Sequence, residues 1–182
     1  LNSPATNIIR FAKEFVKFNE RCFIRLLGDM RSYNFVVNIT PDIDEDFQYR
    51  IRAIDFDQQS YEGRKNLYLP QFFKENTPFV EAVLKHLDKE SIAQYQAEER
   101  TLMTFRLVSS RYRLKELLDN MNTDKISSPE KIEQLKIELA DHFHEIGFLR
   151  PKFMGELLRT QLKHTLRKSL KNLPKTKGRF DD

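Results

Sequence analysis

The chain is poor in the residues that define several large protein classes. Its 182 residues include one cysteine, Cys22, five glycines, seven prolines and no tryptophan. A single cysteine cannot form an internal disulfide, which fits a reducing compartment, and we expect a cytoplasmic protein. The low glycine and proline content excludes collagen-like and low-complexity proteins. No apolar run is long enough to span a bilayer, and no secretion signal is recognisable at the start.

The composition that is present suits a buried core. Hydrophobic residues make up 40% of the chain, aromatic residues 12% and charged residues 32%, which excludes a disordered tail. The length fits one domain of ordinary size or part of a larger one. Because the first residue is Leu1 and not methionine, we expect the chain to be a piece of a longer protein.

Charge is distributed unevenly along the chain. Residues 150–182 contain ten basic and three acidic residues, whereas residues 1–149 contain 21 basic and 24 acidic ones. A basic terminal segment can meet phosphate, a membrane surface or an acidic partner, although such runs are most often solvated helix faces. The aromatic residues do not alternate with the terminal lysines and arginines, which argues against nucleic-acid binding.

The apolar pattern predicts one helix followed by a small hairpin. Apolar residues recur every three or four positions over residues 6–20, which is typical of an amphipathic helix. Residues 33–39 and 47–56 are predicted to be strands, joined by an acidic turn at residues 40–46, and they should pair as an antiparallel hairpin. The short apolar run at residues 22–27 fits either a strand or a buried loop.

From residue 64 onward the pattern predicts a helical body. Cap-and-proline pairs and leucine spacing define four helices, expected at about residues 77–89, 91–121, 129–147 and 151–170. The predicted fold class is therefore mainly α with a small β-hairpin (α+β). Residues 1–173 are expected to form one unit, and residues 174–182 a loose basic tail.

Polar side chains at the two outer ends of the predicted hairpin are the strongest candidates for chemistry. Residues 28–34 read Gly-Asp-Met-Arg-Ser-Tyr-Asn before the first strand, and residues 54–57 read Ile-Asp-Phe-Asp after the second. Since a hairpin brings its outer ends together, Asp29 and Asn34 should lie close to the two aspartates that follow the second strand. Hard divalent cations such as Mg²⁺ prefer these oxygen ligands, and they usually bind substrate phosphates as well.

This order of motifs resembles the C-terminal lobe of the protein-kinase-like superfamily, in which an Asp-x-x-x-x-Asn loop leads through a hairpin to an Asp-Phe-Gly-type motif. The Gly-Asp pair and the Ile-Asp-Phe-Asp sequence are most similar to aminoglycoside and choline phosphotransferases. The resemblance covers residues 6–63 by motif and residues 64–173 only in helical character. It implies a Mg²⁺-dependent kinase that uses ATP or another nucleoside triphosphate and a hydroxyl-bearing acceptor.

The resemblance also implies roles for single residues. Asp29 would accept or orient the proton of the attacking hydroxyl group, and Arg31 would steady the transferred phosphoryl group. Asn34 would hold Mg²⁺, and Asp55 would bridge the metal to the nucleotide phosphates. Asp57, which has no counterpart in the Asp-Phe-Gly form, is a further candidate metal ligand.

The chain departs from the family pattern in places. Leu27 stands where the family usually has histidine, and the loop-to-motif spacing is longer than usual. Upstream of Asp29 there is neither a glycine-rich loop nor a phosphate-contacting lysine. The chain lacks the N-terminal lobe that covers the nucleotide: either it is a C-terminal lobe cut from a longer kinase, or the fold has lost its nucleotide cover. We expect the isolated chain to be inactive. Tyr61 and Gly63 resemble residues of choline-kinase-like sequences, but this match is weaker.

A non-catalytic interpretation stands beside the kinase-like one. The chain would then be a pseudokinase-like scaffold or helical adaptor that binds an acidic partner or nucleic acid through its basic C-terminal helix. The sequence leaves the acceptor and the oligomeric state open. Cys22 is interpreted as a buried hydrophobe. His142 and His144 lie two positions apart, hence on different faces of a helix, which argues against a metal pair.

Overall fold

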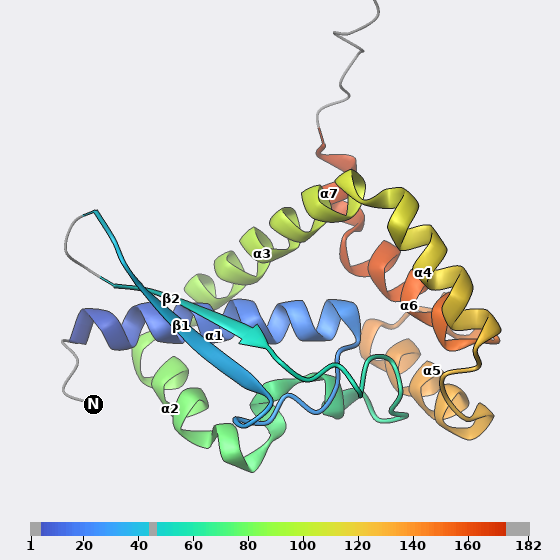
Figure 1. Cartoon of the computed structure of the whole chain (residues 1–182), viewed down its shortest axis with the longest axis horizontal. Helices are drawn as coiled ribbons and strands as arrows, with labels where there is room; N and C mark the ends of the chain where they lie inside the picture. The colour runs from blue at the N-terminus through green and yellow to red at the C-terminus, as the bar shows by residue number, and fades with distance from the viewer. Residues whose placement is uncertain (1–4, 44–46, 174–182) are drawn as a thin grey trace, which may run out of the picture.

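The computed structural model of the chain describes residues 5–43 and 47–173, which form a mainly helical structure with one two-stranded hairpin at its edge (Figure 1). The helices and strands of these residues are α1 (Ala5–Arg25), β1 (Phe35–Pro41), β2 (Phe47–Ala53), α2 (Thr77–His86), α3 (Lys89–Ser109), α4 (Arg111–Thr123), α5 (Pro129–Phe143), α6 (Met154–Thr165) and α7 (Arg167–Lys171). The predicted class, mainly helical with a small antiparallel sheet, is confirmed.

Helix α1 is longer than its sequence pattern predicts. It continues to Arg25, through a run for which the sequence favoured a strand or a loop. Cys22 and Ile24 are both fully buried, because α1 is covered on more than one side and an amphipathic stripe no longer marks the helix. The helix ends where Leu26 takes a left-handed conformation with φ of 49°. The N–H of Leu27 then donates to the Cys22 carbonyl at 2.9 Å, a Schellman-type end.

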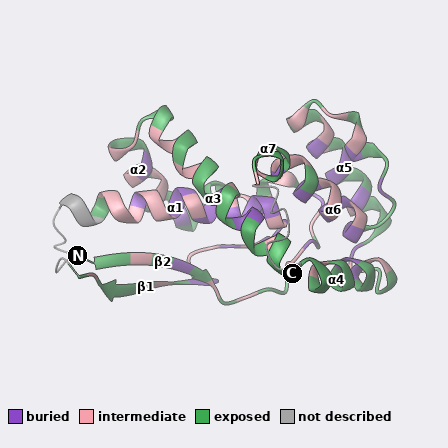
Figure 2. Ribbon diagram, turned by 90° about the horizontal axis from the view of Figure 1, so that it is seen from above, coloured by how far each residue is buried: buried purple, intermediate pink, exposed green. Residues whose placement is uncertain are grey.

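Strands β1 and β2 pair antiparallel, with Phe35 opposite Ala53. Both are shorter at their outer ends than predicted, because the chain leaves the ladder to form the loops around the candidate site. Phe35 and Ile51 are the buried apolar residues of the ladder, and the rest of the hairpin is largely exposed (Figure 2). The tip of the predicted acidic turn, residues 44–46, lies outside the described residues.

Two apolar clusters form the core, and α1 contributes to both. The first contains Phe15 and Phe18 of α1 with Phe35 of the hairpin, and residues of α2 and α3 pack against it. The second contains Ile24 at the end of α1 together with residues of α4, α5 and α6, such as Leu139. Helix α1 therefore joins the hairpin to the helical body (Figure 2).

The helical body is more broken than the leucine spacing predicts. The long helix expected over residues 91–121 is divided at Ser110 into α3 and α4, and the last helix is divided at Leu166 into α6 and α7. Helix α5 does not stop at Gly147, because His144 already takes the left-handed conformation that ends it. The predicted tail, residues 174–182, lies outside the described residues. Within the described part, no helix is both long and apolar enough to cross a membrane.

Candidate functional site

The loop before the hairpin lies against the segment that follows it. Leu27 and Gln59 form an antiparallel bridge, and the N–H of Gly28 donates to the carbonyl of Gln58 at 3.0 Å. The side chain of Gln59 also donates to the carbonyl of Arg25 at 2.6 Å. The end of α1 and the chain that follows β2 are thus fastened together, and the motif residues lie on either side of this junction.

Asp29 is held in a fixed orientation by its neighbours. Its backbone has φ of 58°, and its N–H donates to the carbonyl of Leu67 at 3.1 Å. Arg31 Nε donates to Asp29 Oδ1 at 2.8 Å, and Asn34 Nδ2 donates both to Oδ2 at 3.2 Å and to the Asp29 carbonyl at 2.6 Å. The Asp29 side chain is still 37% exposed, so the carboxylate is accessible from outside the loop.

Arg31 links Asp29 to a carboxylate that the sequence did not indicate. Its Nη1 lies 3.1 Å from Glu75 Oε1, and its guanidinium lies 4.6 Å from the ring centre of Phe73. The hydrogen bond to Asp29 raises the pKa of Arg31 above its usual value, so the guanidinium stays charged. With Nε and Nη1 engaged, these contacts favour a positioning role for Arg31, and its contact with a phosphoryl group stays a prediction. No local motif marks Glu75, which is 44 residues away along the chain.

Asn34 connects this loop to the segment that carries Asp55. Its carbonyl accepts the N–H of Ile54 at 3.0 Å, so Asn34 lies directly beside that segment. Asp55 Oδ1 accepts the N–H of Asp57 at 3.0 Å, which forms a tight turn and leaves Asp57 exposed. The outer ends of the hairpin are therefore adjacent at the level of the backbone.

The donor set at this junction fits a weakly chelated cation. Among the residues that the structure describes, no three His, Cys, Asp or Glu side chains gather as a metal site. Mg²⁺, however, is commonly bound by one or two carboxylates, with waters and substrate phosphates completing its shell. Asp55 supplies one carboxylate, and Asn34, whose amide nitrogen donates to Asp29, lies beside the segment that carries Asp55. A Mg²⁺ site between them stays a prediction. The structure does not bring Asp57 into a carboxylate cluster, and its metal role stays a prediction.

The floor of the loop is apolar. Leu27, at the position where the resemblance leads one to expect histidine, is fully buried in the first cluster. A Cβ atom on Gly28 would lie 3.0 Å from the carbonyl oxygen of Gln58 and 3.3 Å from the ring of Tyr68. Packing and backbone hydrogen bonds therefore support the loop in place of a histidine side chain.

A hollow of about 700 Å³ lies close to Asp29, which is not itself among the residues that line it. Arg31 and Leu67, both of which contact Asp29, line it. Its other lining residues are mostly basic, aromatic or acidic, with one neutral amide, namely Arg64, Lys65, Lys74, Phe72, Phe73, Glu138, Asp141 and Asn66. This hollow is large enough for a small molecule, and Arg31 connects its wall to the Asp29 carboxylate.

Three other residues noted in the sequence, Tyr61, Gly63 and Cys22, contribute to packing. Lys131 Nζ of α5 lies 3.9 Å from the ring centre of Tyr61, and a Cβ atom on Gly63 would lie 2.9 Å from Lys131 Cα. These two residues therefore serve the packing of α5. Cys22 is fully buried, and burial raises the pKa of its thiol to about 12, as expected of a core residue and not of a nucleophile.

No protein-family model, curated protein or solved structure matches this chain. The assignment of a function therefore depends on the geometry of the Asp29 loop, the ends of the hairpin and the hollow beside them.

Proposed function

We propose that the chain is the catalytic half of a kinase-like phosphotransferase, which moves the γ-phosphoryl group of ATP or a similar nucleotide to a hydroxyl group with Mg²⁺. The observation that carries this proposal is the double role of Asn34. Its side chain fastens the Asp29 loop, and its backbone pairs with Ile54, next to Asp55. One residue thereby joins the proposed base to the proposed metal ligand.

In the proposed reaction, the acceptor lies in the hollow with its hydroxyl group at Asp29. The carboxylate accepts the hydroxyl proton as the oxygen bonds to the γ-phosphorus, and the bond from phosphorus to the nucleoside diphosphate oxygen breaks. Arg31 and Asn34 hold the carboxylate in orientation. A bound Mg²⁺ supplies neutralisation of phosphate charge. Most of the rate then comes from positioning and electrostatics.

The proposal includes a nucleotide-covering lobe in another part of the protein. In kinases a glycine-rich loop covers the phosphates and a strand lysine contacts them, and the motifs of this chain correspond only to the opposite side of such a site. We therefore expect the 182-residue chain alone to show no turnover.

The test uses the full gene product and two isosteric variants. Asp29→Asn should lower phosphoryl transfer about 10²–10⁴-fold while nucleotide binding persists. Asp55→Asn should remove the Mg²⁺-dependent part of nucleotide binding, measured by calorimetry. Asp124→Asn, at the exposed end of α4, is the matched control and should leave both unchanged. Wild-type transfer and binding in the first two variants would refute the proposal.

A non-catalytic helical module is the second candidate function. It would be a pseudokinase-like scaffold that binds an acidic partner or nucleic acid through its basic C-terminal helices. The observation in its favour is Leu27, which is buried at the position where the kinase-like family has histidine. Two measurements separate the phosphotransferase from the helical module. One is thermal unfolding with and without Mg²⁺ and ATP, and the other is salt-dependent binding to a polyanion. A nucleotide-dependent rise in Tm without polyanion binding favours the phosphotransferase, and the reverse favours the module.

A further inference from the structure

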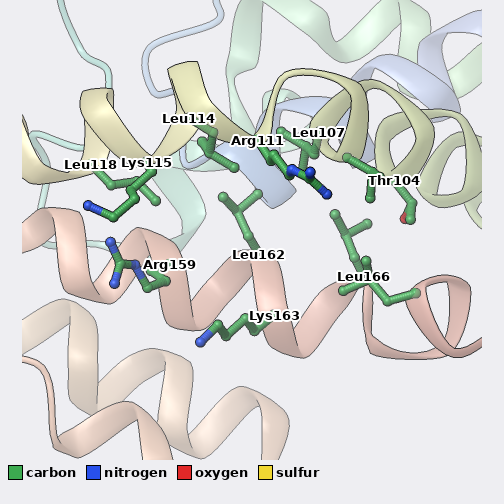
Figure 3. Close-up of a pocket in the computed structure, with 12 residues that line it drawn as sticks. Thr104, Leu107, Arg111, Leu114, Lys115, Leu118, Arg159, Leu162, Lys163 and Leu166 are labelled. Carbon is green, nitrogen blue, oxygen red and sulfur yellow. The ribbon is translucent and has the colours of Figure 1, made fainter. Parts of the chain in front are cut away.

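A groove of about 480 Å³ lies between α4 and α6, next to the break that follows α3 (Figure 3). Its floor is made of leucines from α3, α4, α6, α7 and the junction between α6 and α7, namely Leu107, Leu114, Leu118, Leu162, Leu166 and Leu170. Leu118, Leu162 and Leu166 are no more than 7% exposed. None of the elements that form this groove carries a residue of the Asp29 site.

Two rows of cations border the leucine floor. Arg111 and Lys115 come from α4, and Arg159 and Lys163 come from α6 (Figure 3). The two members of each row are four residues apart, a rise of about 6 Å along a helix. No acidic residue of the described chain lines the groove.

The two rows are only partly neutralised by the chain itself. Asp119 pairs with Lys115 at 2.7 Å and with Arg159 at 3.3 Å. Within the described residues, Arg111 and Lys163 form no ion pair. Positive charge therefore remains on both sides of an apolar floor.

We propose that this groove binds an acidic amphipathic helix of a partner protein. A helix lying along the groove would place an apolar stripe on the leucines, as in other helix-in-groove complexes. Its flanking residues recur at the same four-residue step as the cations, so acidic side chains on both flanks can pair with both rows. The leucine floor and the cations on both of its sides therefore favour an acidic amphipathic helix as the partner.

Other ligand classes match the cations and the leucine floor of the groove less completely. A fatty acid or lipid carries its anionic group at one end, so it can pair with cations at one end of the groove and leaves those at the other end unpaired. Nucleic acid offers phosphates but no apolar stripe for the leucine floor. Residues 174–182 of the chain itself contain three basic and two acidic residues, and so lack the acidic character that the border requires.

The test is a fluorescence anisotropy titration with a labelled helical peptide of about 14 residues, which matches the length of α4 and α6. The probe has leucines at helical spacing on one face, glutamates on both flanks and alanines outside. The control has the same composition with the positions permuted. We expect the amphipathic probe to bind at least about tenfold more tightly than the permuted one, and to weaken as salt is added.

Charge-reversal variants locate the binding. Arg111→Glu and Lys163→Glu remove no internal ion pair of the described chain, and each should weaken the probe about tenfold. Lys85→Glu, on the exposed surface of α2, is the matched control and should bind like wild type. Circular dichroism verifies that each variant is folded.

Three results would overturn the proposal. They are equal binding of the two peptides, binding that Arg111→Glu and Lys163→Glu leave unchanged, and no binding of the peptide at the highest concentration tested. Oleate or a 20-nucleotide DNA is titrated in parallel. If oleate or the DNA binds instead of the peptide, and this binding is lost in the same variants, the groove is a binding site for a lipid or for nucleic acid.

Discussion

The chemistry of Asn34 explains why an amide is suited to the junction of the hairpin ends. Its nitrogen donates to the carbonyl and carboxylate of Asp29, and in the proposed site its oxygen would be the ligand for a cation. An aspartate at the same place would set a second negative charge against Asp29 and would offer no donor. A single neutral side chain therefore keeps the loop closed, and in the proposed site it would also offer an oxygen ligand.

Gly28 offers a direct test of how closely the loop is packed. A methyl group there would press on the Gln58 carbonyl at 3.0 Å and the Tyr68 ring at 3.3 Å, and both belong to the buried floor. Gly28→Ala should therefore lower the free energy of unfolding by about 1–3 kcal/mol, measured by urea denaturation. Gly147→Ala is the matched control, because its Cβ would meet only the flexible Glu145 carboxylate at 3.2 Å. Equal costs for the two variants would contradict the packing described here.

The sequence identified the loop residues that are close together along the chain. Asp29 and Asn34 stand out through their spacing and their place before a strand. Glu75 and Leu67, which hold Arg31 and Asp29, could not be predicted. Their contacts depend on how the segment after β2 folds back, and neither residue belongs to a local pattern.

The same limit explains the errors in helix boundaries. Apolar periodicity predicts a helix while one face is buried, but it fails over residues 22–25 of α1, where several sides are covered. It also runs unbroken across Ser110, because Leu107 and Leu114 on either side of this break pack against the same core. Across Leu166 the leucine spacing continues to Leu170, although that side chain is exposed. Tertiary packing decides the end of α1, and a change of chain direction divides the later helices.

Helix α1 is anchored to α3 by an ionic group that is largely buried. Arg21 lies 2.6 Å from Glu14 and 3.4 Å from Glu99, and Glu99 is 2% exposed. Arg21→Ala would leave the Glu99 charge buried without a partner, so we expect a loss of about 3–5 kcal/mol in the free energy of unfolding.

The matched control for this prediction is an exposed ion pair. Lys115→Ala removes a pair with Asp119 on the surface of α4, and should cost no more than about 1 kcal/mol. Chemical denaturation of both variants gives the comparison. An Arg21→Ala cost as small as that of the surface pair would show that the network does not anchor α1.

Helix α6 carries a histidine that makes stability depend on pH. Burial, followed by the charge of Arg167, lowers the pKa of His164 below its usual value of about 6.5. Its Nδ1 is buried and has no hydrogen-bond partner among the described residues. Below the unfolded pKa, the unfolded chain therefore binds a proton that the folded chain does not, so stability is lost as the pH falls from about 7 to 5.

His164→Phe should flatten this dependence while keeping the ring contact with Phe143, whose centre lies 4.5 Å away. The measurement is the urea midpoint of wild type and variant at several pH values. The pKa of His142 is also lowered, by burial and then by the charge of Lys65, so part of the slope should persist. A variant with the full wild-type slope would exclude His164 as its source.

Hydrogen bonds from α1 to α6 and to β2 also link the two apolar clusters. The buried side chain of Gln161, on α6, donates to the carbonyl of Phe23, on α1, at 3.0 Å. Glu14 of α1 accepts the N–H of Ile51, in β2, at 3.0 Å. The hairpin that carries the candidate site is therefore fastened to the same helix that the helical body holds in place.

This arrangement predicts that the body and the hairpin open together. Leu139 is fully buried in the second cluster, so Leu139→Ala should cost about 2–5 kcal/mol. Because α1 belongs to both clusters, amide hydrogen exchange at Ile51 in the distant hairpin should then accelerate by the same factor as exchange in α5. Ile137→Ala, on the exposed face of α5, is the control and should leave both rates unchanged. Faster exchange confined to the helical body would show that the hairpin and its site have a stability of their own.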